Sequence, residues 1–123
     1  MSLAEVHARL GNTALFFTAA MAIWGLWRFF RRQGVDSNYW GAMVIAEVLY
    51  LVQASLGLFV YLSGAGELGK PYIHILYGVV AVLVIPGVFL YSRGDEQRRS
   101  SLVYAVGFLF LVGIILRSAS TGR

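Results

Sequence analysis

Residues 72–91 read YIHILYGVVAVLVIPGVFLY, twenty consecutive positions without Asp, Glu, Lys or Arg. An α-helix needs about 20 predominantly apolar residues to cross the hydrocarbon core of a bilayer. The stretch therefore predicts a membrane-spanning helix. Pro86 should kink this helix, because proline lacks a backbone N–H and crowds the preceding turn. His74, one of the two histidines in the chain, lies near the start of the stretch.

Three more apolar stretches flank this one, and polar residues at their ends set the expected boundaries. Ser2 and Glu5 fit a capping box before the first stretch. Gly34 is placed to take the left-handed position after it, and Asp36, Ser37 and Asn38 are all suitable N-caps for the second helix. We predict helices over about 3–32, 38–63, 71–92 and 99–117. Residues 1–123 should form a single domain, an all-α integral membrane four-helix bundle with both termini on one side.

Composition excludes several classes of protein. Of 123 residues, 59% are hydrophobic and 13% charged, whereas a soluble domain carries about 25% charged residues. The chain has no cysteine, which excludes disulfides, iron–sulfur clusters, thiolate metal sites and covalently attached c-type haem. It also has no Ser-His-Asp order, phosphate-binding glycine loop or carboxylate-rich metal site. We expect a lipid bilayer as its environment and no nucleic-acid partner.

Basic residues predict the orientation, because cytoplasmic loops carry an excess of Lys and Arg. The side that holds the first and third connections has six: Arg28, Arg31, Arg32, Arg93, Arg98 and Arg99. The side that holds the termini has four: Arg9, Lys70, Arg117 and Arg123. Loops 33–38 and 93–99 are therefore expected in the cytoplasm, and both termini on the outer face of what we expect to be a bacterial plasma membrane.

The two histidines, His7 and His74, are expected at matched depth. Each lies three or four residues into a helix that starts on the outer face, so their depths should differ by only a few ångströms. Two neutral imidazoles facing each other across a bundle suit the axial positions of a haem iron. Gly11, Gly57 and Gly78 could leave room for the porphyrin. Close helix packing also selects small residues, and a histidine at this depth can instead bond a headgroup or a carbonyl.

Three further polar residues are candidates with two readings each. Arg9 could pair with a haem propionate or with Glu5 on the same helix. Glu47 lies near the predicted bilayer midplane, where an ionisable group is a functional candidate by default, but it could be a protonated structural carboxyl bonded to Tyr50, to Ser55 or to a neighbouring helix. Gln53 fits an interhelical hydrogen-bond anchor better than a ligand.

Two segments resemble one half of the haem A synthase family. Residues 53–64, QASLGLFVYLSG, followed by His74 at the start of a helix, resemble that family's Gln-x-x-Leu-Gly helix end, outer loop and ligand helix. Residues 5–11, EVHARLG, resemble its first ligand helix. In that family each half is a four-helix bundle that holds one haem through two outer-facing histidines. The resemblance implies that His7 and His74 are axial ligands of a non-covalently bound haem b.

The expected function is that of a membrane b-type cytochrome, for electron transfer or haem handling. We do not expect the methyl-group oxidation of the synthases, because Glu5 stands two residues before the histidine instead of three and the outer-loop cysteine pair is absent. The half-length chain could form a parallel homodimer or join a larger membrane complex. One alternative is a cofactor-free accessory subunit of a respiratory or photosynthetic complex. Another is a small transporter or quinone-binding protein built around Glu47.

Overall fold

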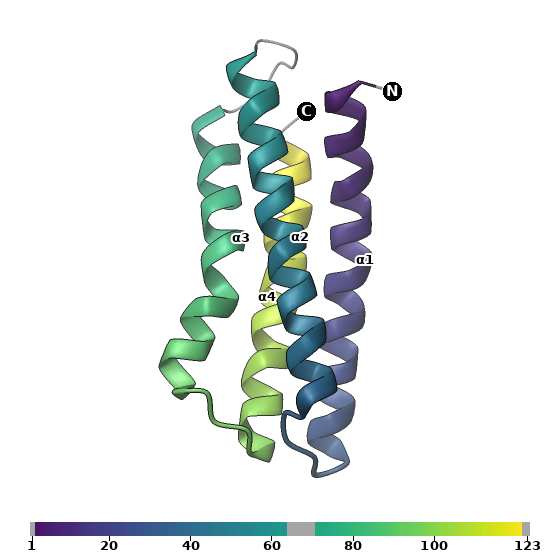
Figure 1. The fold of residues 1–123 in the computed structure, drawn as a ribbon, viewed down its shortest axis with the longest axis vertical. Helices are drawn as coiled ribbons and strands as arrows, with labels where there is room; N and C mark the ends of the chain where they lie inside the picture. Colours follow the sequence, from purple (N-terminus) through teal and green to yellow (C-terminus); the bar gives the residue numbers. More distant parts are fainter. Residues whose placement is uncertain (1, 64–70, 122–123) are drawn as a thin grey trace.

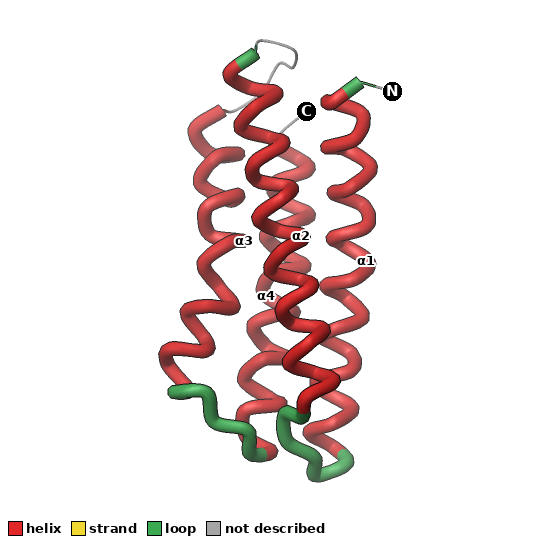
Figure 2. Tube along the Cα trace, viewed as in Figure 1, coloured by secondary structure: helices red, strands yellow, loops and turns green. Residues whose placement is uncertain are grey.

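The computed structural model describes residues 2–63 and 71–121, and all regular structure in these ranges is α-helical. The helices are α1 (Leu3–Phe30), α2 (Ser37–Leu62), α3 (Pro71–Ser92) and α4 (Arg98–Thr121). They run up and down, so that the N-terminus and the end of α4 lie at the same end of the bundle (Figure 1). Figure 2 shows the two described connections together at the opposite end. Lys70 and Arg123, two of the basic residues predicted on the side of the termini, lie outside the described residues.

All four helices are long and apolar enough to cross a membrane. Large apolar side chains on the outside of the bundle, such as Phe16, Leu62 and Leu90, are more than 70% exposed. A bilayer accommodates such a surface, whereas water does not. The predicted fold class is therefore confirmed: the protein is an all-helical integral membrane protein.

The helices form a ring in chain order. α1 packs most extensively on α4, and also contacts α2, while α3 contacts α4 and α2. α1 and α3 therefore stand diagonally opposite each other, as do α2 and α4. Tyr39, Tyr104 and Phe108 form a fully buried centre for the half of the bundle near the described loops. α3 is the most exposed of the four helices, and it bends outward in its second half (Figure 1), the half that contains Pro86.

The helix ends follow the expected chemistry, with one correction. Ser2 Oγ accepts from the Glu5 N–H at 3.1 Å, and Asp36 Oδ1 accepts from the Tyr39 N–H at 2.9 Å, as predicted. The prediction that Gly34 takes the left-handed position was wrong. α1 ends earlier than expected, and Arg32 has the positive φ of 60°. Gly34 is required for another reason, because a Cβ there would overlap the carbonyl oxygen of Glu96.

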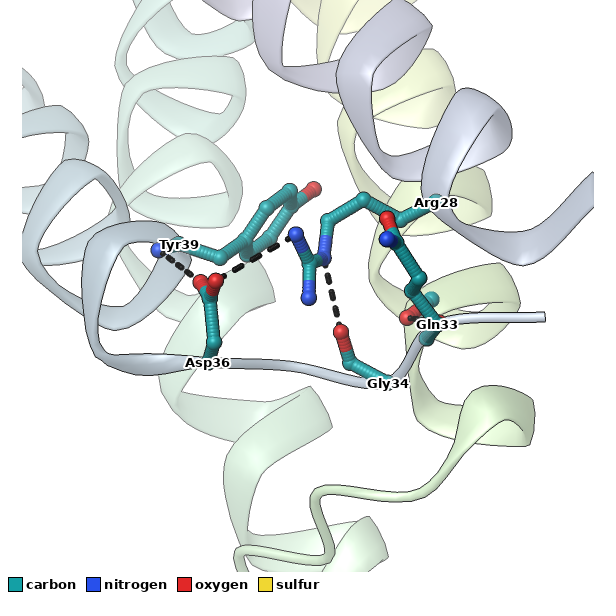
Figure 3. A network of polar contacts seen from close by, with 6 residues as sticks. Arg28, Gln33, Gly34, Asp36 and Tyr39 are labelled. Atoms are coloured by element: carbon teal, nitrogen blue, oxygen red, sulfur yellow. Dashed lines mark hydrogen bonds and ion pairs between the residues drawn. The ribbon is translucent and has the colours of Figure 1, made fainter. Parts of the chain in front are cut away.

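The two described loops are bonded to each other and to the helices. Arg28 connects to the first loop twice, through an ion pair with Asp36 at 3.3 Å and a hydrogen bond from Nε to the Gly34 carbonyl at 2.7 Å (Figure 3). The two loops meet where the Val35 N–H donates to the Glu96 carbonyl at 2.9 Å. Ser101, at the start of α4, donates to the Gln33 carbonyl at 2.7 Å. We call this set of contacts the loop clasp; it fixes α1, α2 and α4 relative to each other.

Candidate functional site

The two histidines face each other at the end of the bundle opposite the loop clasp. His7 belongs to α1 and His74 to α3, and both are half-buried. Their ring centroids are 6.4 Å apart, and the ring planes make an angle of 81°. Since α1 and α3 are diagonal partners, the two rings approach each other across the interior of the bundle. The structure thus brings together the two residues that the sequence predicted as ligands.

The ring of His74 is anchored by α4. Its Nδ1 lies 2.8 Å from the backbone carbonyl oxygen of Ser118 and 3.3 Å from the Ser118 hydroxyl. A carbonyl oxygen only accepts hydrogen bonds, so Nδ1 carries the proton in this arrangement. The lone pair of His74 is then on Nε2. Ser118 was missed by the sequence analysis, because it lies past residue 117, where the fourth helix was expected to end.

The ring of His7 packs on α2. A Cβ at Gly57 would lie 2.8 Å from Cε1 and 3.2 Å from Nε2 of His7, so only glycine at this position allows the contact. Gln53, one turn earlier on α2, donates from Nε2 to the backbone carbonyl of His7 at 2.7 Å. The expected role of Gln53 as an interhelical hydrogen-bond anchor is confirmed. His7 Nδ1 and Gln53 Oε1 are both buried, and neither has a hydrogen-bond partner among the described residues.

The three predicted glycines do not share one role. Gly57 accommodates the His7 ring itself, and Gly11 accommodates Gln53, whose Nε2 would lie 3.1 Å from an added Cβ. Gly78, one turn below His74 on α3, faces open space, because a Cβ there would meet nothing within 4 Å. Two of the three glycines therefore let the His7 and Gln53 side chains pack closely against a neighbouring helix, and an added Cβ at the third would meet no atom within 4 Å.

Arg9 is not brought to the histidine pair. It follows His7 by two residues, which on an α-helix turns its side chain about 200° away, and it is exposed. The alternative ion pair with Glu5 is not formed either, since the ion pair found among the described residues joins Arg28 to Asp36. A contact between Arg9 and a group bound at the histidines would require the long side chain to reach around the end of the helix.

Glu47 lies apart from the histidine pair, in an apolar groove between α2 and α3. The groove is also lined by Trp40, Met43, Val44, Ile85, Pro86 and Phe89. One carboxyl oxygen, Oε1, is buried without a hydrogen-bond partner among the described residues. The Tyr50 hydroxyl pairs with Thr18 at 2.6 Å, and the Ser55 hydroxyl donates to the Leu51 carbonyl. Neither hydroxyl therefore makes the bond to Glu47 that the structural reading expected.

In the described part of the chain, no group of three or more His, Cys, Asp or Glu side chains could hold a metal ion. The end of the bundle opposite the loop clasp therefore offers a pair of imidazoles, His7 and His74, with Gln53 and Ser118 beside them. No protein-family model, curated protein or solved structure matches the chain.

Proposed function

We propose that the protein is a membrane b-type cytochrome that binds one haem b non-covalently between His7 and His74. The single observation that carries this proposal is the relation of the two rings, with centroids 6.4 Å apart. A ring nitrogen bound to a first-row metal ion lies about 2.0–2.1 Å from the ion, and the ring centre lies about 1 Å further out. Two imidazoles on opposite sides of one ion therefore have centroids about 6 Å apart.

The number of histidines and the position of the ring proton on His74 also support haem. A haem iron takes four nitrogens from the porphyrin and needs at most two from the protein, which is what a histidine pair provides. Ligating histidines usually donate the other ring N–H to a carbonyl or carboxylate. His74 makes this bond to the Ser118 carbonyl. Gly78 supports the proposal further, since it leaves space on the inner side of His74.

The proposed role is electron transfer or haem handling at the outer face. A bound haem would supply a one-electron couple, and two protein ligands would leave the iron without an open position for oxygen. The chain's own residues hold the two imidazoles in place from α1 and α3. The excess of Arg at the end of the bundle that holds the two described loops supports the orientation with loops 33–38 and 93–99 in the cytoplasm, and hence the histidine pair near the outside of a bacterial plasma membrane.

A parallel homodimer is the proposed assembly. The exposed apolar surface of α3 supports it, because this helix has few partners within the chain. The detergent-corrected mass in mild detergent and in lipid nanodiscs tests the assembly. A strict monomer in both media would contradict it.

Visible absorption spectroscopy tests the proposed function. The purified protein, supplied with haem and reduced with dithionite, should show the sharp α and β bands of a low-spin six-coordinate haem. His7→Ala and His74→Ala should each lose or alter these bands. Ile75→Ala, the neighbouring exposed position on α3, is the matched control and should keep them. A wild-type protein that stays colourless with haem present would contradict the proposal and favour the cofactor-free accessory subunit.

A further inference from the structure

The helices that do not carry the histidines each contribute a polar group to one ring. α4 brings the Ser118 carbonyl to Nδ1 of His74. α2 brings the Gln53 side chain to His7, where its amide nitrogen bonds the backbone carbonyl. The His74 ring is therefore bonded by α4, whereas α2 bonds the His7 backbone and leaves the His7 ring without a hydrogen bond among the described residues.

The orientation of the Gln53 amide follows from its partner. The His7 carbonyl oxygen accepts and cannot donate, so the amide nitrogen must face it and Oε1 must occupy the other branch of the side chain. Oε1 is buried and lacks a donor, and His7 Nδ1 is buried and lacks a partner. One of these atoms can only accept and the other can donate. Leaving both unpaired in an apolar setting costs about 1–3 kcal/mol for each group.

We propose that Gln53 is a positioning residue for His7. Its Oε1 accepts a hydrogen bond from the His7 Nδ1–H, while its Nε2 keeps the bond to the His7 carbonyl. His7 then presents the Nε2 lone pair, as His74 does through Ser118. These two bonds, one from α2 and one from α4, keep the imidazole planes close to perpendicular. The part of this inference that concerns a bound haem rests on the proposed function; the part that concerns the ring protons does not.

The ring angle needs such an explanation, because the χ2 torsion of histidine is soft and does not by itself fix the plane. The plane of His74 is fixed by its bond to Ser118. The plane of His7 is restricted by contact with Gly57 on one edge, and a bond to Gln53 would fix it. If haem binds between the two histidines, each imidazole would donate π density to the iron in the plane perpendicular to its ring. Perpendicular rings would then leave two iron d orbitals close in energy, whereas parallel rings would split them.

The first arm of the test uses the haem-free protein. Nitrogen-15 NMR of histidine-labelled protein in nanodiscs distinguishes Nδ1–H from Nε2–H tautomers. Both histidines should be Nδ1–H in the wild type. In Gln53→Leu, His7 should become a mixture of tautomers while His74 stays unchanged, which makes His74 the internal control. Ser55→Ala, an exposed position on the same helix, is the matched control and should resemble the wild type. A His7 signal that Gln53→Leu does not change would overturn the proposal.

The second arm uses the haem-loaded protein and electron paramagnetic resonance. The ferric wild type should give the highly anisotropic low-spin signal of perpendicular imidazoles. Gln53→Leu should lose that single signal and bind haem about 10- to 100-fold more weakly. Gln53→Glu restores an acceptor, so it should recover the signal and lower the reduction potential. A wild-type signal typical of parallel planes would overturn the assigned ring geometry. Correct tautomers in a protein that never binds haem would refute the proposed function and leave the positioning role of Gln53 standing.

Discussion

The two ends of the bundle differ in how completely their polar groups are paired. At the loop clasp, Arg28 has a carboxylate and a carbonyl as partners, and Val35 and Ser101 bond carbonyls of neighbouring segments. At the histidine end, one contact between α1 and α2 contains two buried unpaired atoms, on His7 and on Gln53. A membrane protein has little water available to satisfy such atoms. The comparison indicates that the loop clasp stabilises the fold, whereas the histidine end leaves more of its hydrogen-bonding capacity unused within the described residues.

The largest expected effect is at the loop clasp. Gly34→Val should destabilise the bundle by about 1–3 kcal/mol or more, because the added side chain overlaps the Glu96 carbonyl and overpacking at such contacts has this cost. Thermal unfolding in mild detergent measures the change. Gly41→Val, where an added Cβ meets nothing within 4 Å, is the control for introducing a β-branched residue into this region. An unfolding temperature for Gly34→Val equal to that of the control would show that the loops separate at little cost.

Gly57→Ala should have the next largest effect, and it should act on the ligand more than on the fold. The methyl group would meet the His7 ring at 2.8 Å, so the ring must move from its position. We expect haem affinity to fall about 10- to 100-fold, the range found when groups that orient a ligand are changed. Haem titration followed in the Soret region measures this affinity. Gly57→Ala with wild-type affinity would indicate that the His7 ring reorients freely on binding.

Asp36→Ala tests whether a change at the loop clasp lowers stability without changing haem binding. It removes the N-cap of α2 and the ion pair with Arg28, and the loss of such a cap costs about 0.5–2 kcal/mol. Haem affinity should stay unchanged, since Asp36 lies at the loop end of the bundle and the two histidines lie at the opposite end. Unfolding and haem titration on the same preparation separate the two effects. Weakened haem binding with unchanged stability would contradict the assignment of stability to the loop clasp and of haem binding to the histidine end.

The smallest expected change in stability is that of Gly78→Ala. An added methyl group meets no atom there, and replacing glycine by alanine inside a helix favours the helix by about 0.5–1 kcal/mol. The haem-free protein should therefore unfold at a slightly higher temperature. If the space beside Gly78 receives the porphyrin, the same variant should bind haem more weakly. A variant that is more stable and binds haem as well as the wild type would place the ring elsewhere.

The sequence predicted the helices and the proximity of the two histidines from local features: the lengths of the apolar runs and the position of each histidine within its run. Long apolar runs determine the spans, and Ser2 and Asp36 determine helix starts within one turn of their own positions. Contacts between distant segments were harder to predict. The close approach of Gly34 to Glu96 depends on how two loops meet, and the bond from His74 to the Ser118 carbonyl depends on how two helices are rotated about their axes. No residue pattern in these segments contains either arrangement, so the reason for Gly34 was wrongly assigned and Ser118 was missed.

The diagonal placement of the histidines has a consequence for biogenesis. His7 leaves the ribosome with the first helix, and His74 follows only with the third. At roughly 5–20 residues per second, several seconds of synthesis separate them. Ser118, which anchors the His74 ring, is made last of all. A nascent chain with one or two helices in the bilayer therefore contains only one of the two histidines. On the proposed function, six-coordinate haem would mark a chain in which at least the first three helices have been inserted.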